Sequence, residues 1–547
     1  MTLPEKSGSR QIARAAGTIM AAIVLGQLFG LVAKLLLANA YGTAAESDAF
    51  FAANRFSDIL FNLVAGGALA SAFVPTFTGL LARDDPKGAW KLASAVANWV
   101  TLVLTGLALL AAVFAPQVVR YVLAPGWSVT DPEKEALVVQ LLRIQLPSAV
   151  IFGLSGLVMG ILNANQYFLY SALAPLMYQL GWIFGLVALV PRLGVFGMAW
   201  GVVIGALLHL GLQLPALFRL RGRRYLPTLG LDYAPLREVI RLMGPRLVSV
   251  AVVQLNFLVN TNLATGPNMP EGSLTAISYA FQLMIMPLAA IAQSIATAAL
   301  PTFSAQAARG RLDELRASLG AALRGVLLLS IPASLGLILL RVPLVRIIFE
   351  RGEFTARSTE LVAWALLWYA AGLVGHSVLE VVVRAFFALK DTRTPTVVTS
   401  LAMGLNLVLS LLLSALFSAI GWLPFGGLAL ANSLATFLEV SVLLVLLRRK
   451  VYTRTSSQGA GGLGGRSILV AVGQGSLAAF GMSIALVIWI GLTAGRSAWL
   501  VAPGGIVLGG WVYGLLLLAL RVPELHWALG FVSRKVRRLR EKAARTP

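Results

Sequence analysis

Ionisable side chains stand within or at the edges of long hydrophobic segments of this sequence. A charge surrounded by hydrocarbon costs several kcal/mol unless it faces a cavity or a partner, so each of these side chains is a candidate for function. Eight positions share this character: Lys34, Asp48, Arg55, Asp58, Arg246, Glu380, Arg384 and Glu439. They indicate that the chain binds a charged ligand in an apolar environment, or that it uses ion pairs to join its helices.

Lys34 and Arg55 are the pair best suited to binding an anion. They lie in the first two hydrophobic segments, and both can face a solvated cavity that receives a phosphate or diphosphate. Alternatively, Lys34 extends its ammonium group to the membrane interface while Arg55 pairs with Asp58 or Asp48 near a helix end. Both interpretations stay open. Asp48 is a further candidate for the cavity, and Asp58 is a candidate for a structural or gating role.

Other polar positions admit two interpretations each. Glu380 and Arg384 are four residues apart, so they share one face of a helix and can form a structural ion pair. Arg246 begins the seventh hydrophobic segment, where it faces the cavity or marks the cytoplasmic boundary. Gln282 can line a hydrated path or bond one helix to another. We predict cavity roles for Arg246 and Gln282 and a structural or gating role for the Glu380–Arg384 pair.

Composition places the chain in a membrane. It has 547 residues, a mean hydropathy of +0.83 and 12% charged residues, whereas about a quarter of the residues in soluble domains are charged. Its hydrophobic segments are about 20 to 25 residues long, which lets a helix cross roughly 30 Å of hydrocarbon. The first segment is too long for a signal-peptide core and is expected to be retained.

The sequence offers no enzymatic or metal-binding pattern. It contains no cysteine, which excludes disulfides and thiol catalysis, and its three histidines stand far apart, at positions 209, 376 and 526. Nucleophile–base pairs, metal-ligand spacings and phosphate loops are absent from the sequence. We therefore expect neither catalysis nor a cofactor or metal.

The hydropathy pattern predicts an all-α polytopic membrane protein with about fourteen transmembrane helices. The predicted helices cover residues 16–40, 49–81, 92–114, 136–162, 171–190, 196–218, 246–265, 275–303, 319–340, 359–388, 396–419, 426–447, 467–492 and 498–520.

An internal repeat divides these helices. The block Ala72–Phe77 returns 226 residues later as Ala298–Phe303, and Gly126 corresponds in the same way to Gly352. Two similar halves that enclose a central site are the architecture of many transporters. We therefore expect two six-helix repeats around a central cavity, followed by two C-terminal helices, and transport as the function. Chance resemblance is the alternative, because Ala-x-x-Pro is common where membrane helices end.

The distribution of basic residues predicts the topology. One set of loop and terminal segments is rich in Lys and Arg, and the opposite loops hold few, such as Arg192 and Arg496. The rich set comprises Lys6, Arg10, Arg14, Arg83, Lys87, Lys91, Arg219, Arg221, Arg223, Arg224, Arg309, Arg311, Arg316, Arg448, Arg449, Lys450 and the cluster from Arg534 to Arg545. By the positive-inside rule both termini are cytoplasmic. The net charge of +22 is dispersed among short loops, which argues against a nucleic-acid partner and for contact with membrane lipids.

The repeat and the linker composition predict five parts. Residues 1–225 form an N-terminal six-helix lobe, 226–450 a C-terminal six-helix lobe, 451–466 a linker, 467–522 an additional helix pair and 523–547 a basic cytoplasmic tail. The linker contains the pattern GxGxxG at residues 459–464, but no strand precedes it, so it is interpreted as a flexible hinge and not as a dinucleotide site.

Several motifs together resemble one known family. They are Tyr41-Gly42, Ser47–Phe51, Ala72–Pro75, Ala124–Gly126, Gly160–Ala164, Phe349–Phe354 and Arg384–Pro395, which includes the Lys390-Asp391 turn after the tenth helix. This pattern, which runs nearly the full length of the chain, resembles the MurJ (MviN) family of lipid II flippases. Lys390 and Asp391 are accordingly expected to be structural or gating residues.

The resemblance implies a fold, a substrate and a compartment. The fold would be that of the multidrug/oligosaccharidyl-lipid/polysaccharide exporter superfamily, with a groove for the lipid tail beside the two extra helices. The substrate would be a lipid-linked diphosphate glycan used in peptidoglycan biosynthesis and cell shape, moved across the bacterial cytoplasmic membrane. In the family, membrane potential or an ion gradient drives the movement.

The chain departs from the family at the arginines thought to engage the diphosphate. These positions, and an acidic position of the second helix, are occupied here by Gln27, Ala33, Phe61, Asn62, Gln282 and Gly66, whereas Asp48 is retained. Lys34 is adjacent to one of the lost arginines. A one-residue shift rotates a side chain by about 100° around a helix, so Lys34 is a partial substitute.

Three functions follow from this pattern. The leading hypothesis is a flippase for lipid II that works by alternating access. An exporter of another lipid-linked glycan or amphiphile is the second, favoured by the missing arginines. The third is a non-transporting scaffold that contacts other proteins of cell-envelope synthesis.

Overall fold

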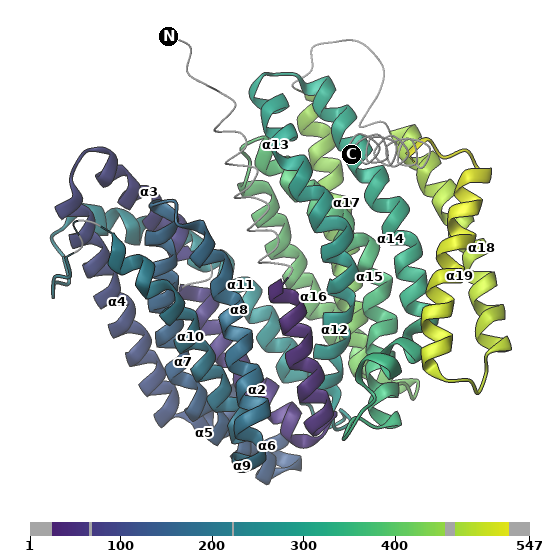
Figure 1. Ribbon diagram of the computed structural model, residues 1–547, viewed down its shortest axis with the longest axis horizontal. Helices are drawn as coiled ribbons and strands as arrows, with labels where there is room; N and C mark the ends of the chain where they lie inside the picture. The colour runs from purple at the N-terminus through teal and green to yellow at the C-terminus, as the bar shows by residue number, and fades with distance from the viewer. Residues whose placement is uncertain (1–24, 65–67, 221, 223, 454–464, 525–547) are drawn as a thin grey trace, which may run out of the picture. The chain divides into compact units, whose positions relative to one another are not determined.

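Every element that the structure describes is a helix. The computed structural model describes residues 25–64, 68–220, 222, 224–453 and 465–524, and no strand occurs among them (Figure 1). The glycine pattern at 459–464, the N-terminal Lys6, Arg10 and Arg14, and nearly all of the C-terminal tail lie outside these ranges. A first helix is described over Leu25–Tyr41. The remaining elements are α2 Ala45–Val64, α3 Ala68–Ala82, α4 Pro86–Val113, α5 Ala115–Val118, η1 Val119–Leu123, α6 Trp127–Thr130, α7 Pro132–Ala164, α8 Phe168–Phe184, η2 Gly185–Leu189, α9 Val190–Leu193, α10 Phe196–Arg219, α11 Ala234–Ala264, α12 Ser273–Leu288, η3 Ala289–Gln293, α13 Ser294–Ala308, α14 Leu312–Phe349, α15 Ala356–Ala388, α16 Arg393–Ala419, α17 Phe425–Thr453, α18 Gly465–Leu492 and α19 Ala498–Ala519.

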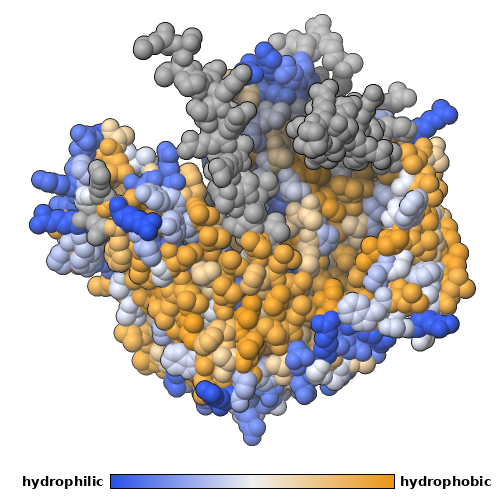
Figure 2. Space-filling model, in the orientation of Figure 1, coloured by the Kyte–Doolittle hydropathy of each residue, from blue (hydrophilic) through white to orange (hydrophobic). Residues whose placement is uncertain are grey.

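Eleven helical spans in the described ranges are long and apolar enough to cross a membrane. Figure 2 shows hydrophobic side chains along the sides of the helices and hydrophilic ones near their ends. Three shorter apolar helices, Leu25–Tyr41, Ala72–Ala82 and Val250–Ala264, fall in the first, second and seventh predicted segments. Within these segments some residues lie outside what the structure describes, and the second segment also carries charged side chains such as Arg55. The all-helical membrane fold is confirmed, and the count of fourteen stays a prediction.

The helices form two compact units, which are considered separately below. The first comprises the described residues up to Ala276 together with Phe349–Ser358, and the second comprises Ile277–Ile348 and the residues from Thr359 onward. The five-part division predicted above concerns the sequence repeat and not these units, and it stays a prediction.

Aspartate caps and prolines begin two long helices of the first unit. Asp85 accepts a hydrogen bond from the Gly88 N–H at 2.8 Å, and Pro86 takes the first position of α4. Asp131 accepts from the Lys134 N–H at 3.0 Å at the start of α7. Both arrangements satisfy a backbone donor that the helix itself cannot pair, and proline costs nothing at this position.

Glycines let α8 and α10 pack closely in the first unit. A Cβ atom at Gly181 would collide with the backbone of Gly205, and one at Gly205 would lie 2.6 Å from the Tyr178 carbonyl oxygen. Gly185 and Gly201 face each other one turn further along. Membrane helices associate through such close backbone approach, because hydrocarbon offers no hydrophobic driving force.

The internal repeat is visible as a pair of matching contacts in the first unit. Gly126 lies against the backbone of Thr265, and Gly352 lies against the backbone of Asn39; in both cases a Cβ atom would collide with a carbonyl oxygen. Thr265 and Asn39 are separated by the same 226 residues as Gly352 and Gly126. Each helix end therefore receives a loop glycine that comes from the other half of the sequence.

In the second unit, α18 and α19 pack against α14 (Figure 1). Leu328 and Leu340 of α14 share an apolar core with Met482 of α18 and Leu517 of α19. The Tyr513 hydroxyl donates to the Leu328 carbonyl oxygen at 2.6 Å. This contact satisfies a buried hydroxyl and fixes the rotation of α19 against α14.

Candidate functional site

Lys34, Arg55 and Asp58 form a charged cluster in the first unit. Lys34 lies on the first helix and the other two lie on α2, and the three groups interact electrostatically with one another. All three side chains are half-buried. The structure thus brings together three of the residues that the sequence singled out, with two cationic groups beside one carboxylate.

Polar atoms of α2 and α8 surround this cluster. Asn54 Nδ2 donates to Asp58 Oδ2 at 3.1 Å. Asn54 also bonds the side chain of Tyr178, and Tyr178 interacts electrostatically with Asp58. Within the described residues, Asn54 Oδ1, Ser57 Oγ and Gln179 Oε1 are buried without a hydrogen-bond partner. Buried polar atoms normally find partners, so the unpartnered Asn54 oxygen beside Asp58 indicates a site that water or a polar ligand completes.

Arg55 is held from α11. Its Nε donates to Thr261 Oγ1 at 3.2 Å, and its guanidinium carbon lies 5.3 Å from the centre of the Phe257 ring. The Thr261 hydroxyl occupies one edge of the guanidinium and the Phe257 ring covers one face. The Nη donors can therefore bind another group. A guanidinium fixed in this way suits an oxyanion, which it can bind through two parallel hydrogen bonds.

Asp48 occupies a different kind of site, which is closed. The residue is 2% exposed. Asp48 Oδ1 accepts from the Thr275 N–H at 2.9 Å and from Thr275 Oγ1 at 2.7 Å, while Oδ2 accepts from the Gly272 N–H at 2.9 Å. The carboxylate of α2 therefore caps the N-terminus of α12, where unpaired N–H groups and the helix dipole favour a negative charge.

Lys134 of α7 completes the site around Asp48. Its Nζ lies 3.3 Å from Asp48 Oδ2 and 4.1 Å from the centre of the Trp127 ring. The Asp48 carboxylate has a lysine and three backbone or hydroxyl donors, so its surroundings are those of a structural latch and not of an open binding cavity. We name the group Asp48, Lys134, Gly272 and Thr275 the α12 latch. The predicted cavity role of Asp48 is not supported by these contacts and stays a prediction.

A second set of contacts lies beside the α12 latch. The Glu353 N–H donates to the Asn39 carbonyl oxygen at 3.0 Å, and the Thr43 and Ser358 hydroxyls are 2.9 Å apart. Gly42, at a φ of 53°, lies against the Glu353 carbonyl oxygen, an approach that only glycine allows. These contacts join the turn after the first helix to the segment Phe349–Ser358.

The structure locates the other predicted cavity residues without assigning them a ligand. Gln282 lies on α12 in the second unit and is half-buried. Arg246 lies on α11, but its side chain is outside what the structure describes. Cavity roles for both residues stay predictions.

The predicted ion pair between Glu380 and Arg384 is present in the second unit, on α15. Glu380 Oε1 also accepts from Gln293 Nε2 of η3 at 3.1 Å, and Arg384 Nη2 donates to Thr297 Oγ1 of α13 at 3.5 Å. One turn earlier on α15, His376 Nε2 lies 3.0 Å from Asn432 Oδ1 of α17. Glu439, for which the sequence offered no partner, accepts from the Thr399 hydroxyl of α16.

The Lys390-Asp391 turn joins α15 to α16. Lys390 has a positive φ of 58°, which ends α15. Asp391 accepts from the Thr394 N–H at 3.0 Å and from its hydroxyl at 2.7 Å, and it forms an ion pair with Lys450 of α17. Burial alone would raise the pKa of the Asp391 carboxyl, but the hydrogen bonds from Lys450 and Thr394 lower it to about 2. These contacts are structural.

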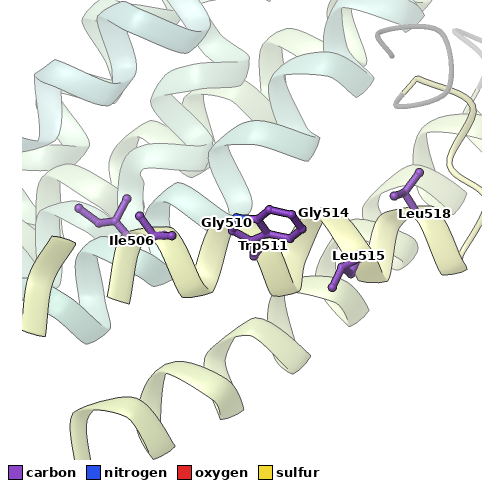
Figure 3. Close-up of a pocket in the computed structure, with 7 residues that line it drawn as sticks. Ile506, Gly510, Trp511, Gly514, Leu515 and Leu518 are labelled. Atoms are coloured by element: carbon purple, nitrogen blue, oxygen red, sulfur yellow. The ribbon is translucent and has the colours of Figure 1, made fainter. Parts of the chain in front are cut away.

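An apolar hollow of about 500 Å³ lies on the outer face of α19 (Figure 3). Gly510 and Gly514 have no neighbouring heavy atom where a Cβ would stand, so they form its floor. Ile506, Trp511 and Leu515 surround it and are each more than half exposed. In a membrane this surface faces the hydrocarbon of lipids.

Sequence reasoning missed Lys134, Tyr178 and Gln293. Lys134 stands in the acidic first turn of α7, outside the predicted hydrophobic segment 136–162. Tyr178 and Gln293 are uncharged, so they did not stand out among apolar residues. Asp131 and Pro132 mark the start of α7, which is a signal that Lys134 lies at a helix end, but no local pattern joins it to Asp48, 86 residues away. Among the described residues, no group of three or more His, Cys, Asp or Glu side chains is arranged to hold a metal ion.

Solved structures share this fold. One titled as the lipid II flippase MurJ in an inward closed conformation matches 92% of this chain and 98% of its own, with a TM-score of 0.76 and 24% identity. An inward-facing multidrug resistance transporter of the MATE family in the MOP superfamily matches 79% of this chain and 96% of its own, with a TM-score of 0.64 and 15% identity. The chain therefore has the multi-pass helical fold of these two structures.

Sequence comparison assigns the family within this class. The family model described as lipid II flippase MurJ matches residues 37–502. The lipid II flippase MurJ of Burkholderia cenocepacia is 30% identical over 448 residues, which cover 80% of this chain and 84% of the relative. A probable lipid II flippase MurJ of Rhizobium tropici is 28% identical over 444 residues and covers 79% and 80%. The chain belongs to the lipid II flippase MurJ family.

Proposed function

We propose that this protein is a lipid II flippase, which moves the lipid-linked peptidoglycan precursor across the bacterial cytoplasmic membrane by alternating access. The observation that carries the proposal is the pair of cations Lys34 and Arg55 on the first two helices, beside Asp58 and the buried, unpartnered side-chain oxygen of Asn54. A diphosphate is a compact dianion that such a pair recognises. Family membership over residues 37–502 supports the same substrate.

Each part of the site has a role in this proposal. Arg55, oriented by Thr261 and Phe257, binds one phosphate group, and Lys34 neutralises the other. Asp58, whose carboxylate interacts with both cations, holds them close together when no substrate is bound. The α12 latch keeps one end of the first unit closed and opens during the transport cycle. The role is transport and not catalysis, with both termini cytoplasmic.

A second candidate substrate is another lipid-linked glycan or amphiphile. The specific observation in its favour is the departure from the family's arginines. One of those positions is Ala33, which is 0% exposed and cannot contribute a cation to any cavity. Lys34 and Arg55 form a smaller cationic set, which suits a headgroup with less negative charge. Contacts with other proteins of cell-envelope synthesis are part of the proposal in either case.

Complementation tests the proposal most directly. The gene is expressed in a bacterium whose resident lipid II flippase can be depleted, with membrane insertion checked by immunoblot. We expect growth to be rescued by the wild type and lost with Lys34→Ala or Arg55→Ala. Arg192→Ala, which removes an exposed cation elsewhere in the first unit, is the matched control and should rescue. Rescue by both cluster variants would refute the assigned roles, and failure of the well-expressed wild type would favour the second substrate.

A further inference from the structure

A polar hollow in the first unit has no part in the site built on Lys34 and Arg55. Its volume is about 440 Å³, within the range of roughly 300–1,000 Å³ that is usual for sites of small ligands. Three segments of the first unit line it: the turn after the first helix, the loop before α12 and the segment Phe349–Ser358. We define the polar hollow by its charged side chains and its buried hydroxyls, which are Thr43, Glu46, Glu271, Glu353, Arg357 and Ser358.

Backbone contacts hold the walls of the polar hollow together. Gly42 has a φ of 53°, and a Cβ atom there would lie 2.4 Å from the Glu353 carbonyl oxygen. Gly272 has a φ of 88°, and a Cβ atom there would lie 2.5 Å from the Thr43 carbonyl oxygen. The three segments therefore meet at distances that only glycine allows. A hollow formed in this way exists before a ligand arrives, which lowers the entropic cost of binding.

Three carboxylates line the polar hollow, those of Glu46, Glu271 and Glu353. Within the part of the chain that the structure describes, none of them forms an ion pair. Nor do they form a group that could hold a metal ion, a statement that again concerns the described residues. Carboxylates that cannot enclose one metal ion suit an organic ligand whose ammonium groups are spread over several atoms.

Donors for an anion line the same hollow. Thr43 and Ser358 are 9% and 3% exposed, and their hydroxyl oxygens are 2.9 Å apart. Two hydroxyls that share one hydrogen bond use only one of their two hydrogens. The other hydrogen has no acceptor among the described residues, so a buried donor is left for a ligand. Arg357, next to Ser358, adds a guanidinium that is not in an ion pair there, and the two donors together suit a carboxylate.

We propose that the polar hollow binds a short peptide that carries one free carboxylate and at least two ammonium groups. The carboxylate accepts hydrogen bonds from Arg357 and from the Thr43–Ser358 hydroxyl pair. The ammonium groups lie against the carboxylates of Glu46, Glu271 and Glu353. Three carboxylates and one guanidinium give this lining an excess of two negative charges, which a ligand with a net positive charge offsets.

The predicted topology places the polar hollow on the side of the membrane opposite the cytoplasm. The first helix follows the basic N-terminal segment and ends at Tyr41, immediately before the turn that lines the hollow. The peptide therefore comes from outside the cytoplasm, either as the peptide part of a translocated lipid or as a free peptide. The inference goes beyond the proposed function and does not depend on it, because its evidence includes neither Lys34 nor Arg55.

Binding of a defined peptide to the detergent-purified protein tests this. The probe is the tripeptide Ala-Lys-Ala with free termini, studied by isothermal titration calorimetry at about pH 6.5, where both of its amino groups are protonated. We expect saturable binding that weakens as NaCl is added, because the partners are accessible to solvent. Ala-Glu-Ala, which reverses the side-chain charge, and the C-terminal amide of Ala-Lys-Ala should each bind at least about fivefold more weakly.

Variants assign the binding to the polar hollow. Glu353→Gln should weaken binding of Ala-Lys-Ala by about fivefold. Arg357→Gln should do the same and should also abolish the difference between the peptide and its amide, which a merely structural role of Arg357 would not do. Glu133→Gln, which changes an exposed carboxylate in the first turn of α7, outside the hollow, is the matched control and should bind as wild type does. Unchanged midpoints of thermal unfolding check that the variants are folded.

Three results would overturn the proposal: no saturable binding to wild type, equal affinities for Ala-Lys-Ala and Ala-Glu-Ala, or wild-type affinity in both Glu353→Gln and Arg357→Gln. Competition with purified lipid II distinguishes the two sources of the peptide. Displacement of the tripeptide supports the peptide part of a lipid as the ligand, and retention supports a free peptide. If wild type fails to restore growth in the complementation test but binds the tripeptide as expected, the proposed function fails and the peptide site stands.

Discussion

Lys134 Nζ lies 3.3 Å from Asp48 Oδ2 in a pair whose side chains are 5% and 3% exposed. The residues come from α7 and α2, and their charges are almost fully removed from water. Such a pair is stable only when its remaining bonding capacity is used. Here the carboxylate receives three further hydrogen bonds from Gly272 and Thr275, and the ammonium group lies over the Trp127 ring.

Removing the cation from this pair should destabilise the protein strongly. In Lys134→Met the Asp48 carboxylate stays buried without a counter-charge, and we expect a loss of about 3 kcal/mol in the free energy of unfolding. The control is Arg311→Met, which removes the cation of the pair Arg311–Glu314, whose side chains are 57% and 53% exposed. That change should cost less than about 1 kcal/mol.

Denaturant unfolding of the detergent-purified variants provides the measurement. The double variant Asp48→Asn, Lys134→Met should recover part of the loss, because no uncompensated charge remains. Equal losses in Lys134→Met and Arg311→Met would show that burial of the Asp48–Lys134 pair is energetically unimportant.

Close packing of α8 against α10 gives a second prediction. Gly181→Val places side-chain atoms where the backbone of Gly205 lies, so the two helices must separate. We expect a loss of about 2 kcal/mol or more, in the upper range for overpacking, and a lower midpoint of thermal unfolding. Gly211→Ala, on α10 at a position with no neighbouring heavy atom within 4 Å, is the control and should not lower the midpoint. A stable Gly181→Val would show that these helices are not constrained by backbone contact.

Much of the fold could be predicted from the sequence because lipid imposes simple rules on it. Apolar length identifies membrane helices, and the spacing of Glu380 and Arg384 predicts their pairing on one helix face. The repeat of Gly126 at Gly352 reflects matching contacts with helix ends. Each of these signals lies within one segment or in a comparison of two segments.

The site could be predicted only in part. Lys34 and Arg55 stand out because a cation is rare in an apolar helix. Tyr178 and Thr261, which complete their surroundings, are neutral residues whose roles depend on which helices meet. The α12 latch illustrates the same limit. The sequence marks Asp48 as a charge at the edge of an apolar segment, but its partners Lys134 and Thr275 lie 86 and 227 residues away, and no local rule connects them.

Orientation of Arg55 by α11 gives a functional prediction. Thr261→Val keeps the shape of the side chain but removes the oxygen that accepts from Arg55 Nε. A hydrogen bond to a charged group contributes about 1.5 kcal/mol, so we expect transport of lipid II into proteoliposomes to fall by about tenfold. Thr76→Val, which removes only a bond to the backbone one turn earlier in α3, is the control and should retain wild-type rates. Wild-type transport by Thr261→Val would show that Arg55 needs no orientation from α11.

The Asp391 turn predicts a dependence of stability on pH. Hydrogen bonds from Lys450 and Thr394 overcome the effect of burial and lower the pKa of Asp391 to about 2, below the value of about 3.9 in an unfolded chain. A lowered pKa means that the folded state binds fewer protons than the unfolded state. The stabilisation by Asp391 is therefore complete above about pH 4 and is lost as the pH falls through about 2.

Comparison of wild type with Asp391→Asn measures this contribution. The difference in their free energies of unfolding should be constant between about pH 8 and about pH 5, and it should shrink as the pH falls from about 4 towards 2. Asp232→Asn, which changes a fully exposed carboxylate opposite Arg237, should show no such difference at any pH. A difference that declines already between about pH 7 and about pH 5 would contradict the assignment, since it would require a raised pKa for the Asp391 carboxyl and hence a turn in which Lys450 does not hold the carboxylate.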